Sequence, residues 1–235
     1  MKYFPSNHFR ESGFSLIEIS IVLLIVVLLL GGLLPTISSQ IDQQRRNETR
    51  RQLDEIQQAL MGYAISYKRF PCPAIQTIAT IPGTDNGAGK PDITGGICNR
   101  YTGVLPWVEL GLKETDAWER RFTYSVTSAF TASAGFSLST AGTLKILDST
   151  GGNTIANNLP AVVVSHGSNG LGAYLPLGTQ ISNSSAGTDE KTNSNFPGPI
   201  ISFVSHEFRP DFDDMVVWIT RNTLFNRMVA AGQLP

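Results

Sequence analysis

The feature of the sequence that most restricts its fold is a long apolar run near the amino terminus, preceded by one acidic residue. From Ile19 to Ile41 there are 23 residues without a charge, and Glu18 lies inside the apolar stretch that begins at Phe14. Residues 14 to 34 would form a helix of about 30 Å, which predicts a transmembrane segment. The chain after Asp42 has no comparably hydrophobic stretch, so the sequence predicts a single crossing.

Three interpretations of this run are a cleaved secretory signal, an ordinary transmembrane anchor, and a helix that follows a short leader of another type. A secretory signal has an apolar region of roughly 7 to 15 residues, which is shorter than the run seen here. An ordinary anchor gives no reason for Glu18, because an unpaired carboxylate in hydrocarbon costs at least about 3 kcal/mol. The third interpretation is favoured, and we expect Glu18 to have a partner.

The residues around Gly13 resemble the processing signal of type IV pilins and type II secretion pseudopilins. A leader of residues 1–13 ends at Gly13, Phe14 follows it, and Glu18 is the fifth residue after the junction. The resemblance implies cleavage between Gly13 and Phe14 by a prepilin peptidase, followed by N-methylation of Phe14. It also implies that Glu18 neutralises the new amino group of a neighbouring subunit during assembly.

Pro35 adds to this resemblance, since pilin helices similarly carry a proline at this distance from the cut. A proline inside a helix removes a backbone hydrogen bond and loosens the preceding turn. The resemblance gives Pro35 a role in assembly. The alternative is that Pro35 merely ends a membrane helix.

The predicted location is the inner membrane, with a single crossing, a periplasmic or extracellular carboxyl-terminal domain and filament association after assembly. Charge alone predicts the opposite orientation, because two basic residues precede the run and four follow it: Lys2 and Arg10, then Arg45, Arg46, Arg50 and Arg51. The leader is meaningful only if it faces the peptidase, and this requirement decides the orientation.

The remaining sequence predicts an α+β fold, in which a long N-terminal helix over 14–69 has a transmembrane half (14–34) and an amphipathic half. This helix is expected to pack against a mostly antiparallel, pilin-like β-sheet domain over 70–235. Short β-type runs separated by turn residues support the sheet, at 121–127, 135–139, 143–147, 161–167, 200–206 and 215–220. A last helix is expected over 222–231.

Two long loops are predicted, over 73–97 and 178–199. Cys72 and Cys98 flank the first loop and are the only cysteines. Their spacing is unlike the close pairs of zinc or redox sites, so a structural disulfide is favoured, with two free thiols as the alternative.

Two groups of aspartates are weak candidates for a cation site, because calcium binds oxygen ligands. Neither has the regular spacing of a calcium motif, so aspartates in turns or ion pairs are the favoured interpretation. We therefore expect no cofactor and keep calcium as a side hypothesis. The weak candidates are Asp85 and Asp92 in the first group and Asp213 and Asp214 in the second.

The segment 165–170, with sequence SHGSNG, contains serine and histidine but lacks the GxSxG spacing of a hydrolase nucleophile. A turn after the preceding strand explains its glycines, and no enzymatic activity is expected. The net charge of −1 gives no field that would attract nucleic acid.

These observations predict a structural subunit, a minor pilin or pseudopilin, of a type II secretion or type IV pilus filament. Its expected partners are the prepilin peptidase, other pilin or pseudopilin subunits and lipid of the inner membrane. The alternative is a membrane-tethered periplasmic enzyme or binding protein. The sequence does not distinguish the two filament systems.

Overall fold

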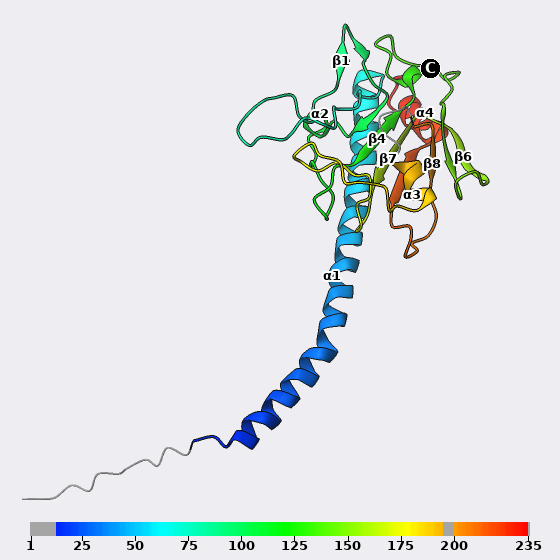
Figure 1. Ribbon diagram of the computed structural model, residues 1–235. Coiled ribbons are helices and arrows are strands. Elements are labelled where there is room, and N and C mark those ends of the chain that lie inside the picture. Colours follow the sequence, from blue (N-terminus) through cyan, green and yellow to red (C-terminus); the bar gives the residue numbers. More distant parts are fainter. Residues whose placement is uncertain (1–12, 195–199, 235) are drawn as a thin grey trace, which may run out of the picture. The chain divides into compact units, whose positions relative to one another are not determined.

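The computed structural model describes residues 13–194 and 200–234, with the backbone alone described at 30–38. The chain divides into two compact units, residues 1–44 and residues 45–235, and each is described by itself. Helix α1 spans Leu16–Tyr67 and therefore belongs to both units (Figure 1).

In the first unit, α1 begins after three non-helical residues and carries an apolar stretch. Within the described residues, no helix offers an apolar length sufficient to cross a membrane. The predicted fold class with a transmembrane half over 14–34 and the predicted single-pass inner-membrane location are therefore wrong.

The described residues of the second unit form three β-sheets rather than one predominant sheet. The largest has four antiparallel strands, in the order β3 (Thr102–Val104), β4 (Thr123–Val126), β7 (Ala161–Ser165) and β9 (Met215–Ile219). The second has the order β6 (Thr154–Leu159), β5 (Leu144–Leu147) and β8 (Ser202–Val204), and its β5–β8 pair is parallel. A short hairpin joins β1 (Ile93–Thr94) to β2 (Ile97–Cys98).

Three short helices and one 3-10 turn complete the described part of this unit: α2 (Trp107–Leu110), α3 (Thr188–Asn193), α4 (Arg221–Ala230) and the turn at Ser128–Phe130. The side chain of Thr220 caps α4 by accepting a hydrogen bond from the Thr223 N–H at 3.2 Å.

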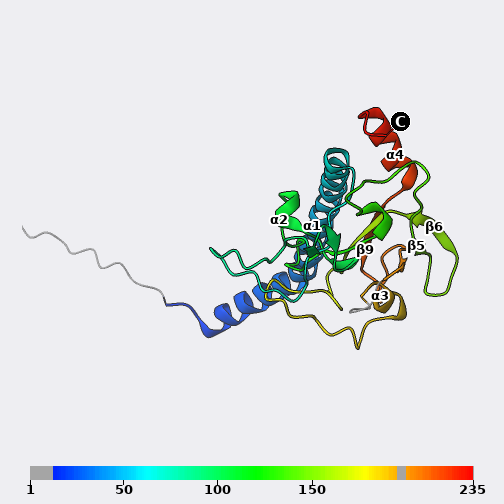
Figure 2. The same cartoon turned by 90° about the horizontal axis from the view of Figure 1, so that it is seen from above.

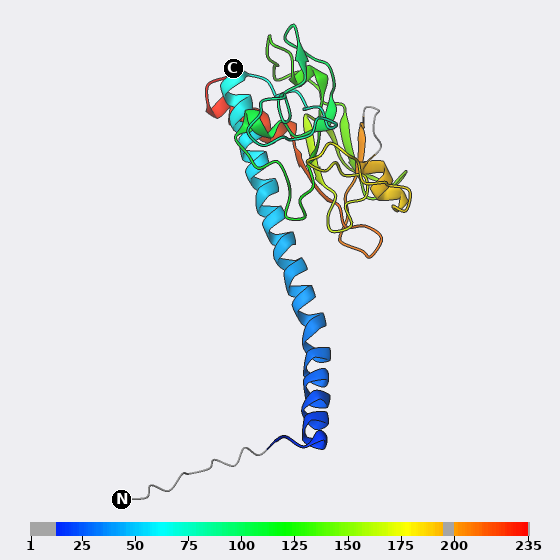
Figure 3. The same cartoon turned by 60° about the vertical axis from the view of Figure 1, so that its left-hand side comes forward.

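The four-stranded sheet lies between helices and the second sheet. On β7, Val163 packs with Leu60 of α1 and Met228 of α4, whereas Val162 and Val164 pack against the second sheet. Figure 2 shows α1 on one side of β9 and β5 and β6 on the other, and Figure 3 shows α4 beside the end of α1. Because both faces are covered, all five residues of β7 are buried.

Several sequence predictions of single elements are confirmed in this unit. Strands occur within the predicted runs at 121–127, 143–147, 161–167, 200–206 and 215–220, and the last helix lies within one residue of its predicted range. The run at 135–139 forms no strand. Strands β3 and β6 lie outside the predicted runs, and α3 lies within the loop predicted over 178–199.

A disulfide joins Cys72 to Cys98, as the sequence favoured, with a Cα–Cα distance of 5.3 Å. Both residues are buried. The bond closes the loop over 73–97, in which the β1–β2 hairpin lies.

Candidate functional site

The most unusual polar feature of the described residues is a group of three buried carboxylates, which we call the acidic centre. Glu190 comes from α3, and Asp213 and Asp214 immediately precede β9. These residues are only 1 %, 8 % and 7 % exposed. One oxygen from each carboxylate lies within 4.8 Å of the others.

A glycine turn fits closely against this centre. Gly167 follows strand β7 and has a φ of +57°, a conformation that residues with a Cβ rarely adopt. A Cβ atom at this position would overlap the backbone and side chain of Asp213. The glycine therefore lets the turn after β7 approach the acidic centre, which gives a structural reason for the SHGSNG segment.

The turn supplies hydrogen bonds to two of the three carboxylates. The Ser168 hydroxyl and the Asn169 N–H donate to Asp213 Oδ2 at 2.6 and 2.8 Å. The Asn169 side-chain amide donates to Glu190 Oε1 at 2.8 Å. These bonds fix the positions of the carboxylates, because each joins the turn to another element.

Asp214 is held separately, by Asn193 of α3, whose side-chain amide donates to Asp214 Oδ2 at 2.8 Å. The other oxygens of the two aspartates, Asp213 Oδ1 and Asp214 Oδ1, are buried and have no hydrogen-bond partner among the described residues. A buried carboxylate oxygen without a partner is costly.

The acidic centre favours protonation or a bound cation. Burial raises the pKa of Glu190, the negative charges of Asp214 and Asp213 raise it further, and the hydrogen bond from Asn169 opposes them. Carboxylates that share one buried site repel one another unless a proton or a cation intervenes. The three oxygens are the hard ligands that calcium prefers, so these residues could hold such an ion.

His166 lies beside the acidic centre in an arrangement that superficially resembles a catalytic triad. Its Nε2 is 2.8 Å from Thr123 Oγ1, and its Nδ1 is 3.5 Å from Asp214 Oδ1. All three side chains are buried, and the pocket that Asp214 lines includes neither Thr123 nor His166. Ser165 donates instead to the buried Asp116 at 2.7 Å. The arrangement joins strands and offers no nucleophile to a substrate.

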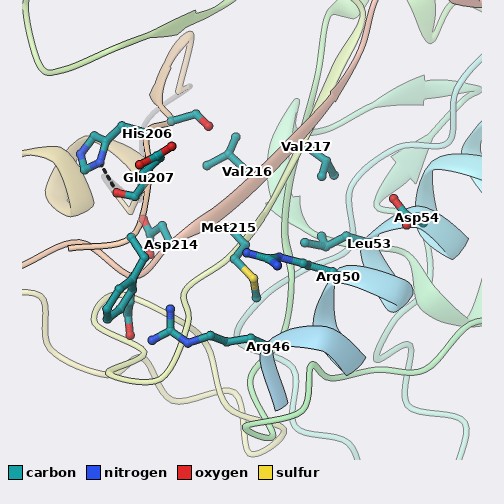
Figure 4. A pocket seen from close by; sticks show the side chains of 13 residues that line it. Arg46, Arg50, Leu53, Asp54, His206, Glu207, Asp214, Met215, Val216 and Val217 are labelled. Atoms are coloured by element: carbon teal, nitrogen blue, oxygen red, sulfur yellow. Dashed lines mark hydrogen bonds between the residues drawn. The ribbon is translucent and has the colours of Figure 1, made fainter. Parts of the chain in front are cut away.

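A pocket of about 640 Å³ adjoins the acidic centre, and we call it the edge groove (Figure 4). It lies between α1, the loop at 205–208 and β9. Arg46 stacks on Phe208 at one wall, with 3.6 Å between the guanidinium carbon and the ring centroid. The residues that line the groove are Arg46, Arg50, Leu53, Asp54, Ser205, His206, Glu207, Phe208, Asp213, Asp214, Met215, Val216 and Val217.

The structure separates the first pair of predicted cation ligands from the acidic centre. Asp85 forms an exposed ion pair with Lys90. Asp92 accepts hydrogen bonds from Arg100 at 2.6 Å and Asn99 at 2.8 Å. The ion-paired interpretation describes these two aspartates.

Asp213 and Asp214 do lie in the acidic centre, but sequence reasoning missed Glu190. The sequence predicted a loop at Glu190. In the structure this residue lies in the short helix α3, and the packing of α3 beside the segment before β9 brings Glu190 close to the two aspartates. The acidic start of α3 was the one local signal for that helix.

The predicted processing site lies at the start of the first unit. Gly13, Phe14 and Ser15 are exposed and non-helical, and a Cβ at Gly13 would meet no atom within 4 Å. The Ser15 N–H donates to Glu18 Oε2 at 3.5 Å. Residues 1–12 of the predicted leader lie outside the described residues, and Pro35 lies in α1 where only the backbone is described.

Comparisons with protein-family profiles, with curated proteins and with solved structures gave no match. The resemblance to prepilins therefore rests on the sequence around Gly13.

Proposed function

We propose that the protein is a subunit of a type II secretion or type IV pilus filament, cleaved after Gly13 and assembled through the beginning of α1. The observation that carries this proposal is the exposure of the apolar side chains there. From Leu16 to Leu29, the large apolar side chains are between 41 and 91 % exposed. Contiguous exposed apolar surface of this kind marks an interaction site.

The partner of this surface is the same segment of neighbouring subunits. Burying each large aliphatic side chain contributes about 1.5 to 3 kcal/mol, so even partial burial of this stretch supports stable association. Cleavage leaves a positive amino group on Phe14, and Glu18 is the acidic residue in the first turn of α1. A carboxylate of one subunit beside the amine of the next provides the charge pairing that this apolar contact needs.

The chain conformation at Gly13 supports the cleavage step. A peptidase requires an accessible, extended substrate, and residues 13–15 are exposed and precede the helix. Because a side chain at Gly13 would touch nothing within the described chain, a substitution there tests recognition by the peptidase separately from folding.

The test is co-expression of the full chain with a prepilin peptidase, followed by sequencing of the mature amino terminus. N-methylated phenylalanine at position 14 is expected, and Gly13→Leu should accumulate the precursor. Cells without the peptidase provide the control. An intact Met1, or a cut elsewhere in the apolar stretch, would show that the protein is not processed as a pilin and would favour the enzyme or binding-protein alternative.

A second candidate function is calcium binding at the acidic centre, favoured by the two buried aspartate oxygens that have no hydrogen-bond partner among the described residues. Glu190, Asp213 and Asp214 fit this ion because they offer hard oxygen ligands within 4.8 Å of one another. Calcium bound by them would neutralise the carboxylates and stabilise the segment before β9 against α3.

Calorimetric titration of the full chain with calcium chloride tests this second function. Asp213→Asn should weaken binding by at least about tenfold, because it removes one charged ligand. Asp85→Asn, which removes a carboxylate outside the centre, is the matched control. No heat of binding up to millimolar calcium, or equal effects of the two variants, would contradict the proposal.

A further inference from the structure

The four-stranded sheet ends at β9, and none of the described residues forms a strand on the outer edge of β9. Four of its five residues are only half-buried, so the edge is not sealed by the rest of the second unit. An unpaired strand edge presents N–H and C=O groups that pair readily with another extended chain. The direction of each backbone group on β9 therefore decides what the edge can bind.

The alternation of hydrogen bonds along β7 follows from its pairing with β4. The Thr127 N–H donates to the Pro160 carbonyl at 2.8 Å, one residue beyond the last paired positions of the two strands. In an antiparallel pair, hydrogen-bonded positions recur at every second residue. The backbone groups of Val162 and Val164 on β7 therefore point toward β4.

The backbone N–H and C=O groups of the intervening residues of β7 point toward β9. Val163 is paired with Val217, so the backbone of Val217 points inward, toward β7. The backbone N–H and C=O groups of Val216 and Trp218 must then point toward the free edge. An independent contact agrees, because the Gln57 side chain donates to the Trp218 carbonyl at 3.0 Å from outside the sheet.

The free backbone groups of Val216 open into the edge groove, which Val216 lines. None of the described residues supplies a partner for its outward N–H or C=O. The carbonyl of Trp218 already accepts a hydrogen bond from the Gln57 side chain, so an added strand could not pair with β9 beyond this residue. The groove therefore presents a short length of open edge, bounded at one end.

The charge of the groove near α1 indicates what kind of chain would fit. Arg50 lines the groove, is exposed and forms no ion pair with any described residue. In Figure 4 its side chain extends from the helix toward Met215. Asp54, Glu207, Asp213 and Asp214 also line the groove, so a basic chain would find carboxylates there, but none of the four forms an ion pair with Arg50 in the described part of the chain.

We propose that the edge groove binds an extended segment of a partner polypeptide, which adds to β9 as a fifth strand. The backbone of the segment pairs with the N–H and C=O of Val216, and an acidic side chain pairs with Arg50. This mode of recognition takes affinity from main-chain hydrogen bonds and selectivity from alternate side chains. It goes beyond the filament proposal, because it uses residues 45–235 alone.

The experiment measures amide hydrogen exchange of the full chain by NMR in a non-ionic detergent, with and without a synthetic peptide. The probe is an eight-residue peptide of alternating threonine and valine with one central glutamate, which we call the glutamate peptide. The control is the lysine peptide, in which lysine replaces that glutamate. The glutamate peptide should slow exchange at Val216. Val217 is the internal control, because its N–H already pairs with β7 and should exchange slowly throughout.

The charge contact is tested with Arg50→Glu, an exposed change that leaves the core intact, and with Arg45→Glu as the matched control outside the groove. The lysine peptide should bind about tenfold more weakly to the natural chain, and Arg50→Glu should remove or reverse that preference. Arg45→Glu should not change it.

Three results would overturn the proposal. The first is unchanged exchange at Val216 with millimolar glutamate peptide. The second is a peptide preference that Arg50→Glu does not alter. The third is protection of Val216 that increases with protein concentration alone, which would assign the edge to a second copy of this chain.

Discussion

The two units of this protein use apolar side chains in opposite ways. In the second unit, Leu53, Ile56 and Leu60 of α1 are buried against the sheet and α4. In the first unit, the same helix exposes every large apolar side chain from Leu16 to Leu29. Helix propensity does not distinguish the two stretches, because leucine and isoleucine occur in both. What differs is whether the chain itself covers these side chains, and our filament proposal assigns the exposed ones to contacts between subunits.

The largest expected effect tests whether that partner is another subunit. Glu18→Val should leave cleavage after Gly13 intact and abolish assembly, because the amine of Phe14 would then enter an apolar contact without an anion. Amino-terminal sequencing and recovery of sheared filaments measure the two steps. Glu55→Val, an exposed acidic residue of α1 in the second unit, should assemble normally.

Normal assembly of the Glu18→Val protein would refute the pairing of this carboxylate with Phe14. Loss of cleavage would instead assign Glu18 to processing. Only the first result would alter the contrast between the two units, because the exposed stretch would then associate through apolar contact alone.

The next prediction concerns Arg121, which is the largest fully buried side chain of the second unit. It donates to Glu114 Oε1 and to the carbonyl oxygens of Gln76 and Pro176, at 2.8, 2.8 and 2.9 Å. Arg121→Ala should lower the free energy of unfolding by about 3 to 5 kcal/mol, because it leaves one buried and two partly buried acceptors without their donor. Denaturant unfolding followed by tryptophan fluorescence measures the loss.

Lys113→Ala is the control for Arg121, since Lys113 is exposed and its ion pair with Glu48 is long, at 3.5 Å. Its effect should stay within about 0.5 kcal/mol. If the two variants unfold at the same denaturant concentration, the Arg121 network does not hold the second unit together.

A slightly smaller effect is expected from the disulfide. Replacing Cys72 and Cys98 together by alanine should cost about 3.5 kcal/mol, the chain-entropy value for a loop of this size. The loop over 73–97 should then become the first segment cut by a protease. Equal denaturation midpoints for the oxidised and reduced natural chain would show that the bond does not stabilise the second unit.

The smallest effect involves pH. Burial raises the pKa of Asp92, but hydrogen bonds from Asn99 and Arg100 outweigh it and leave the pKa below its ordinary value. The folded chain therefore binds this proton less readily than the unfolded chain, and Asp92 stabilises the fold above a pH of about 4. That contribution, at most about 1 kcal/mol, should disappear as the pH falls through the lowered pKa.

Asp92→Asn keeps a side chain of the same shape and should remove this part of the pH dependence. The check is the denaturation midpoint of both proteins between pH 7 and pH 3. Parallel curves over the whole range would contradict the prediction.

Sequence patterns predicted the parts of the second unit in which local and tertiary preferences agree. The valines of β7 and β9 are β-branched residues in buried or half-buried strands, and both strands were predicted. Strand β6 was missed because its sequence, TIANNL, is polar and largely exposed. Its conformation comes from pairing with β5 rather than from its own composition.

The candidate sites were likewise predictable only where neighbouring residues in the sequence form them. Asp213 and Asp214 were recognised as possible ligands because they are adjacent in sequence. Glu190 was not, because its proximity depends on how α3 packs. The edge groove left no local signal at all, since the free edge of β9 follows only from the order of strands in the sheet. The transmembrane prediction over 14–34 was wrong, because no helix of the described residues offers an apolar length sufficient to cross a membrane.

The order of strands along the chain has a consequence for how the second unit unfolds. After β5 and β6, the chain returns to the four-stranded sheet for β7, goes back to the other sheet for β8 and ends with β9 in the first. Neither sheet can be completed before both are nearly built. We therefore expect one cooperative transition, and we expect any truncation between residues 140 and 214 to remove at least β9 from the four-stranded sheet.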